Sequence, residues 1–169
     1  MLFRSLTMNK IGFFPYTPAT QMLHGLTVAI DMLHKEGLDN VFTRHARFAE
    51  ATRRAVRTWG LEILCRDPKY YSPTVTAVLL PEGHDADKLR SLALDHFDIS
   101  YGASFGKLTG KYFRIGHLGD TNDLTILGAL AGTEMALTLA GVPIKKGGVQ
   151  AAMDYITSVH GGAQRAAAE

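Results

Sequence analysis

The stretch that most limits the possible folds is TNDLTILGALAGTEMALTLAG, residues 121–141. Its spacing predicts a helix capped by Thr121 or Asn122, and apolar side chains occupy nearly its whole circumference. A helix without a polar face is buried, so other elements must surround this one. It can pack closely against its neighbours because it carries several small residues: Gly128, Ala129, Ala131, Gly132 and Ala136.

The rest of the chain supplies the elements that could cover this helix. Further helices are expected over residues 18–36, 38–59, 85–97 and 148–162, and short strands over 61–65, 74–81, 98–104 and 110–117. This order predicts one α/β (α+β) domain with a short sheet of about four strands covered by helices on one side. Asp85 is the expected cap of the third helix.

Composition narrows the class of protein. The chain has 169 residues, of which 46% are hydrophobic and 20% are charged, and its net charge is +2. These values are typical of one globular domain and give no reason to expect binding to nucleic acid or to a membrane. The single cysteine, Cys65, is expected to be a buried filler in a reducing compartment, and the first ten residues do not resemble a signal peptide, so we expect a cytoplasmic protein.

Several clusters of polar residues favour a structural role. The seven histidines show no metal-ligand spacing, so we expect no metal site, and His117 is expected to be packed rather than catalytic. The arginines between residues 44 and 57 surround Glu50 and lie opposite Phe48 and Trp59, which favours a solvated face over a nucleic-acid surface. The glycine-rich stretch at 101–111 lacks the context of a phosphate loop and reads as a flexible connection.

Two features could instead bind anions. Thr17 and Pro18 read as the cap and first residue of a helix that ends before Gly37, and such a helix start offers free backbone N–H groups. An ordinary capped helix is still the favoured interpretation of these residues. Arg114 lies in an apolar strand, where an unpaired guanidinium is costly. Either it pairs with an acid such as Asp120 or Glu134, or its planar fork is held ready for a carboxylate ligand.

A resemblance to a known family favours the second interpretation of Arg114. The runs FFPYTPAT, SPTVTAVLLPEG and YFRIGHLGDTNDLTILGALAGTEMAL closely resemble class V (fold type I) pyridoxal-phosphate aminotransferases. The nearest group is serine–glyoxylate (alanine–glyoxylate) aminotransferase, and the likeness is collinear over residues 8–150. It implies that Arg114 grips the substrate carboxylate. It also implies that Thr17 reaches the cofactor phosphate of the partner subunit in a homodimer, with Phe14 or Tyr16 supplying a nearby aromatic ring.

The resemblance also predicts the extent of the protein. It implies a linker from a large domain at residues 1–16, the small C-terminal domain at 17–160, and a tail at 161–169. The Schiff-base lysine of the family is expected in that large domain, and Lys10, Lys107 and Lys111 do not match its position. We therefore expect a C-terminal part of an enzyme that transfers an amino group from serine or alanine to glyoxylate, with no catalytic residue of its own and little activity alone. The alternative is a stand-alone oligomerisation or regulatory module.

Overall fold

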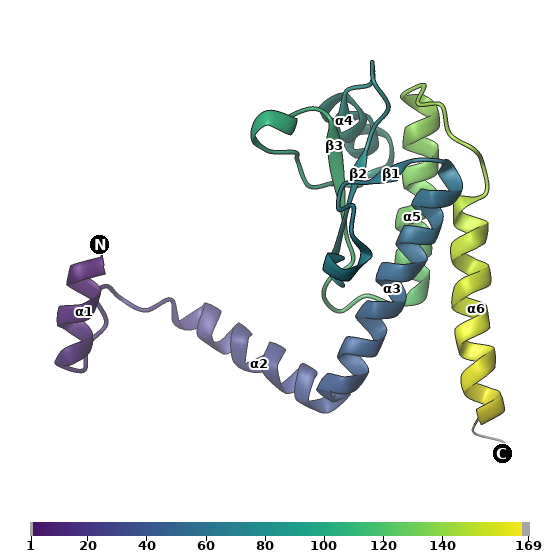
Figure 1. Ribbon diagram of the computed structural model, residues 1–169. Helices are drawn as coiled ribbons and strands as arrows, with labels where there is room; N and C mark the ends of the chain where they lie inside the picture. Colours follow the sequence, from purple (N-terminus) through teal and green to yellow (C-terminus); the bar gives the residue numbers. More distant parts are fainter. Residues whose placement is uncertain (1, 167–169) are drawn as a thin grey trace. The chain divides into compact units, whose positions relative to one another are not determined.

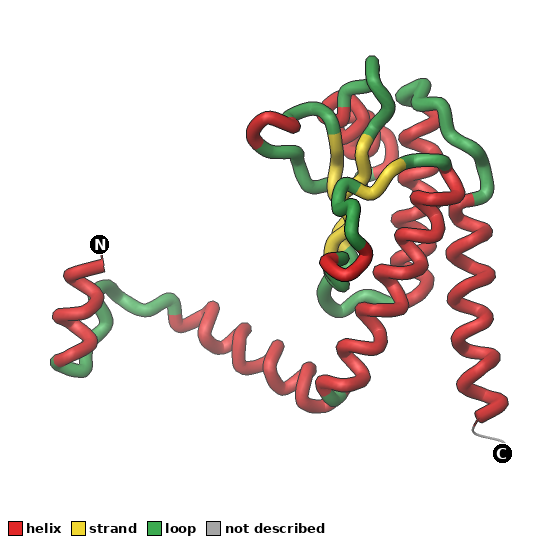
Figure 2. The backbone as a smooth tube through the Cα atoms, in the orientation of Figure 1, coloured by secondary structure: helices red, strands yellow, loops and turns green. Residues whose placement is uncertain are grey.

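The computed structural model describes the backbone of residues 2–166 and the side chains of residues 6–161. The chain divides into two compact units, Met1–Val41 and Phe42–Glu169. Figure 2 shows that most of the chain is helical and that the strands are short. The elements in chain order are α1 (Leu2–Lys10), α2 (Thr20–Glu36), α3 (Leu38–Trp59), β1 (Glu62–Ile63), η1 (Pro68–Tyr70), β2 (Val75–Leu79), α4 (Ala86–Phe97), η2 (Gly106–Leu108), β3 (Tyr112–Gly116), α5 (Asp123–Leu139) and α6 (Gly148–Ala166).

The first unit contains α1, which the sequence did not predict, and α2. The apolar residues of α2 fall at helical spacing as expected, yet none of its residues is buried. The exposed set includes Met22, Leu23, Leu26, Ile30 and Leu33. Helical periodicity therefore predicted α2 correctly. The described residues of this unit do not cover its apolar face.

The second unit is built on an antiparallel sheet in the order β1-β2-β3. Ala77 pairs with Arg114, and Val78 pairs with Phe113. The expected fourth strand at 98–104 is reduced to an isolated bridge between Gly102 and Arg114, because only that pair meets the edge of β3. The α+β class with helices on one face is confirmed, with three strands and one bridge in place of four strands.

Helices cover one face of this sheet. The face that carries Val78, Phe113 and Ile115 joins one core cluster with residues of α3, α4, α5 and α6. Figure 1 shows α3, α5 and α6 along the same side of the sheet. The expectation that α5 is buried on all sides is wrong, because the described elements cover only part of its circumference and leave an apolar stripe of Leu124, Met135 and Leu139 exposed. The buried residues of α5 are Ile126, Leu130, Gly132, Thr133, Ala136 and Leu137.

Local capping chemistry sets several of the helix ends. The Asp85 carboxylate accepts the Asp87 N–H at the start of α4, and the Asn122 side chain accepts the Thr125 N–H at the start of α5. Gly37 adopts a φ of 85° after α2, a backbone conformation that favours glycine. The backbone of α6 continues to Ala166, past the residue at which the sequence predicted a tail, and residues 167–169 of that tail lie outside the described residues.

Glu134 joins three helices. Its carboxylate accepts the Trp59 indole N–H at 2.7 Å and the Gly148 backbone N–H at 3.1 Å. It thereby ties α5 to the end of α3 and to the start of α6. Partial burial raises the pKa of Glu134, but hydrogen bonds from Trp59 and from the backbone at 147–149 outweigh that effect and hold the pKa below its ordinary value.

We expect Glu134→Ala to destabilise the fold by about 2–3 kcal/mol, because it leaves the Trp59 N–H and a helix start without an acceptor. Urea unfolding of the chain at pH 7 measures the change. Glu82→Ala, at an exposed turn residue, is the control and should stay within about 0.5 kcal/mol of the wild type. Equal losses for the two variants would contradict this role.

His117 is fully buried beneath the sheet, as the sequence predicted for a packing residue. Its Nδ1 lies 3.0 Å from the Pro73 carbonyl, and its Nε2 lies 3.0 Å from the Thr76 hydroxyl. A neutral ring that donates from Nδ1 and accepts at Nε2 satisfies both partners. Burial lowers the pKa of His117 to about 4, although the bond to Pro73 opposes this change.

Folding stability should therefore depend on pH between about 6.5 and 4. In this range the unfolded chain binds a proton at His117 that the folded chain does not, so the free energy of unfolding falls as the pH falls. A pKa reduction of this size corresponds to about 3 kcal/mol across the range. Urea unfolding at pH 7 and at pH 4 tests this. His117→Asn should be less stable at pH 7 but show a shallower pH dependence, and an unchanged slope would contradict the assignment.

Candidate functional site

Arg114 lies on the face of the sheet that the helices leave open. Side chains alternate along β3, so Phe113 and Ile115 enter the core while Arg114 points to the opposite face. Its partner on β2 is Ala77, whose small side chain leaves room on the same face of the sheet. The same period of two that buries the apolar residues of β3 therefore presents the guanidinium on the outer face.

The guanidinium of Arg114 is held by its own domain. Its Nε donates to the Ala103 carbonyl at 3.0 Å, and its Cζ lies 4.6 Å from the centre of the Phe105 ring. The ion pairs among the described residues do not include Arg114. Its Nη1 and Nη2 make no hydrogen bond to a described residue.

The expected internal partners of Arg114 are engaged or remote. Glu134 is occupied by Trp59 and by the start of α6, and Asp120 is exposed in the loop before α5. The ion-pair interpretation of Arg114 is therefore wrong for these two acids. An unpaired guanidinium with two free terminal nitrogens suits a carboxylate, which it can bind in bidentate fashion.

A pocket of about 360 Å³ opens beside Arg114 on this face. Its walls come from α3, from the segment between β1 and β2, and from β2 itself. The lining residues are Arg53, Ile63, Leu64, Cys65, Tyr70, Tyr71, Ser72, Val75, Thr76, Ala77 and Arg114. The lining is mostly apolar and contains two cations and no acid, so it favours a small anion with an apolar portion.

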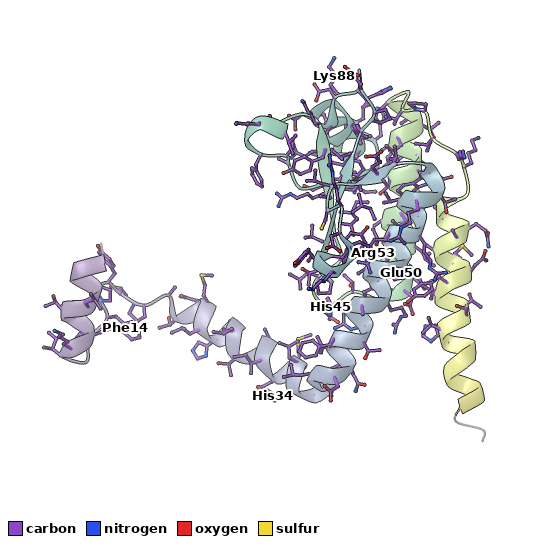
Figure 3. All side chains as sticks on the ribbon, in the orientation of Figure 1. Phe14, His34, His45, Glu50, Arg53 and Lys88 are labelled. Atoms are coloured by element: carbon purple, nitrogen blue, oxygen red, sulfur yellow. The ribbon has the colours of Figure 1, made fainter. Side chains whose placement is uncertain are left out.

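One residue of this pocket differs from its expected environment. Cys65 is not a buried filler, because β1 ends at Ile63 and Cys65 is a partly exposed residue of the pocket wall. Arg53 extends from α3, as Figure 3 shows, and donates to Glu50 at 3.3 Å. Its Cζ also lies 5.1 Å from the centre of the Tyr71 ring. Arg54 and Arg57 reach the same Glu50 carboxylate, so internal pairing engages these arginines of α3.

The three residues expected at the cofactor lie in the first unit. Phe14, Tyr16 and Thr17 are exposed in the segment that precedes α2. Thr17 does not cap that helix: Ala19 occupies the N-cap position without a side-chain hydrogen bond, and the helix begins at Thr20. The predicted cap is wrong because Pro18 and Ala19 stay outside the helix. Thr17 is thus an exposed hydroxyl, three residues before the first turn.

Sequence reasoning missed the residues that hold Arg114. The glycine-rich stretch was expected to be a flexible connection, yet it contains Gly102, Ala103 and Phe105, all in contact with the arginine. The loop is anchored by the Ser104 hydroxyl, which accepts the Gly110 N–H at 2.7 Å. The available signal was an aromatic residue, Phe105, between Gly102 and Gly106, nine residues before the arginine in sequence.

The described part of the chain offers neither a metal site nor a membrane span. Residues 6–161, whose side chains are described, contain no group of three or more histidine, cysteine, aspartate or glutamate side chains that could hold a metal ion. No helix there is long and apolar enough to cross a bilayer. Pyridoxal phosphate needs a lysine for covalent attachment, and no lysine lines the pocket beside Arg114. The two arginines of the lining suit a small carboxylate, and the lining supplies no group for covalent attachment of this cofactor.

Comparison with known proteins identifies relatives of this arrangement. No profile of a known protein family matches the chain. It is 49% identical over 150 residues to the serine–glyoxylate aminotransferase of Hyphomicrobium methylovorum. The aligned region covers 88% of this chain and 37% of that protein. It is also 44% identical over 153 residues to the serine–glyoxylate aminotransferase of Arabidopsis thaliana. That aligned region covers 89% of this chain and 38% of that protein. The chain thus spans little more than a third of the length of these relatives.

Solved structures agree with this assignment. The ureidoglycine–glyoxylate aminotransferase of Bacillus subtilis matches with a TM-score of 0.78 and 34% identity, covering 85% of this chain and 37% of that chain. The pyridoxamine–pyruvate aminotransferase of Mesorhizobium loti matches with a TM-score of 0.80 and 35% identity, covering 86% of this chain and 38% of that chain. The chain belongs to the class V pyridoxal-phosphate aminotransferase family and corresponds to the C-terminal part of its members.

Proposed function

We propose that this chain is the substrate-carboxylate-binding part of an aminotransferase that moves an amino group from serine or alanine to glyoxylate. The observation that carries the proposal is the unpaired Arg114 fork on the open sheet face, beside a pocket with no acid in its lining. Amino donors and 2-oxo acceptors of this kind share a carboxylate next to the reacting carbon. One clamp can therefore serve both halves of the reaction.

Arg114 would orient each substrate by its acid end. Two N–H donors in one plane restrict the rotation of a bound carboxylate and so fix the direction of the bonds on the adjacent carbon. The cofactor, when bound, withdraws electrons from that carbon so that its proton can be removed. The contribution of this chain is therefore affinity and orientation at the carboxylate, while the proton-transfer lysine is proposed to lie in the large domain of the family.

The cofactor contacts of this chain are proposed for the segment before α2. Thr17 offers an exposed hydroxyl that could donate to a phosphate oxygen, and the Phe14 and Tyr16 side chains are 65% and 56% exposed. Exposed aromatic rings next to a hydroxyl suit contact with a flat, phosphorylated ring. We propose that these residues serve the partner subunit of a homodimer, as the family resemblance implies.

Substitution of Arg114 tests the clamp in a complete enzyme. In a chimaera, this chain replaces the matching part of the Hyphomicrobium relative. Arg114→Lys should raise the KM for serine and for glyoxylate by about 10- to 100-fold, because lysine loses the bidentate grip. The cofactor content, measured by absorbance of the purified protein, should stay the same.

Arg57→Lys is the matched control, since Arg57 is half exposed and pairs only with Glu50 among the described residues. It should leave both KM values within about twofold of the parent chimaera. An Arg114→Lys chimaera with unchanged KM for both substrates would remove the basis for the clamp.

The isolated chain tests whether covalent attachment of the cofactor requires the large domain. After incubation with pyridoxal phosphate and borohydride reduction, peptide mass spectrometry should find no single lysine modified in stoichiometric yield. The reason is that the pocket beside Arg114 contains no lysine. Stoichiometric modification of one lysine would contradict the proposal. Formation of a stable oligomer that gains no activity with the large domain would favour the alternative of a stand-alone oligomerisation module.

A further inference from the structure

The segment 102–105 forms a bracket around the Arg114 side chain, which we call the arginine bracket and define as Gly102, Ala103 and Phe105. The side chain of Arg114 lies over the Cα of Gly102, its Nε donates to the Ala103 carbonyl, and its Cζ faces the Phe105 ring at 4.6 Å. Three different contacts from one short segment therefore restrict a side chain that would otherwise sample many rotamers.

Gly102 provides the space for this arrangement. A Cβ atom at this position would lie 2.8 Å from Nε of Arg114 and 3.1 Å from its Cζ. Neither residue can withdraw easily, because the two backbones exchange N–H···O bonds at 3.0 Å in both directions. The glycine is required here for space, since its φ does not lie in the left-handed region. Any larger residue would displace the guanidinium.

Phe105 supplies the second wall, and the protein fixes its position. The Phe105 N–H donates to the hydroxyl of Tyr112 at 3.2 Å, and the Tyr112 side chain is buried in the domain. The Phe105 ring is nevertheless 64% exposed. A large apolar ring held outside the core, with a cation against it, is better explained by its contact with Arg114 than by packing.

The Ala103 carbonyl determines which nitrogens of the Arg114 guanidinium remain available to a ligand. Because Nε is occupied, only Nη1 and Nη2 can bind a ligand in bidentate fashion. We propose that Gly102 and Phe105 are positioning residues that make Arg114 grip the substrate carboxylate end-on through Nη1 and Nη2. This inference rests on the proposed function of Arg114 and adds the residues that determine how it binds.

Gly102→Ala in the chimaera described above is the first test. The KM for serine and for glyoxylate should each rise about tenfold or more, because a displacement of about 1 Å at such a group is costly, while kcat stays within about twofold. Gly128→Ala is the matched control, since a Cβ there meets nothing within 4 Å and the residue lies within α5. An unchanged KM in Gly102→Ala overturns the proposal.

Phe105 is tested by a conservative pair. Phe105→Leu removes the ring but keeps an apolar side chain and should raise both KM values. Phe105→Tyr keeps the ring and should restore them to within about twofold of the parent. Equal effects of the two substitutions would show that the loop, and not the ring against the cation, is what matters, and would overturn the role of Phe105.

The isolated chain gives a readout that does not depend on catalysis. In ¹H–¹⁵N spectra, the Arg114 Nε–H should exchange slowly with water because the Ala103 carbonyl holds it. Gly102→Ala should abolish this protection, and Gly128→Ala should keep it. Loss of protection together with a higher KM supports the bracket. Loss of protection with an unchanged KM overturns its role in binding, and a KM that is unchanged in Arg114→Lys overturns the proposed function itself.

Discussion

The geometry of the site depends on the two faces of a short sheet and on the fact that helices cover only one of them. A strand places successive side chains on opposite faces, so burying Phe113 and Ile115 obliges Arg114 to face outward. A shift of one residue in the register would bury the guanidinium among the helices, which is costly for a charged group without a partner. The packing that stabilises the core therefore also presents the cation on the open face.

Much of this arrangement could be predicted from local sequence. Asp85 caps α4 as expected, and Asn122, one of two candidates with Thr121, caps α5, because a cap is a contact over two or three residues. The helix α5 was evident from its apolar spacing, but its predicted burial on all sides was wrong, since Leu124, Met135 and Leu139 are exposed. Thr17 failed as a cap although its residue type was suitable, since the helix begins at Thr20. Local rules predicted most of the elements and several of their ends, but they missed α1 and predicted a fourth strand that is only a bridge.

The features that sequence could not supply are the contacts between distant segments. Glu134 and Asp120 were equal candidates to neutralise Arg114, and only the fold shows that Glu134 is committed to Trp59 and to the start of α6. The fourth strand became one bridge because a single pair, Gly102 and Arg114, meets at the edge of β3. Whether an arginine is neutralised depends on whether the nearby acids already have other partners. The spacing of residues in the sequence does not give this information.

The arginines of α3 and Arg114 differ in what their guanidinium groups contact. Arg53, Arg54 and Arg57 share the Glu50 carboxylate and support α3, and the half-exposed pairs of Arg54 and Arg57 contribute little individually. Arg114 has the opposite arrangement: one carbonyl, one aromatic wall and no acid. A neutral carbonyl and a ring restrain the guanidinium without cancelling its charge, whereas an acid would compete with the ligand. A clamp for an incoming carboxylate needs this combination, because restraint lowers the entropic cost of binding while the retained charge supplies its strength.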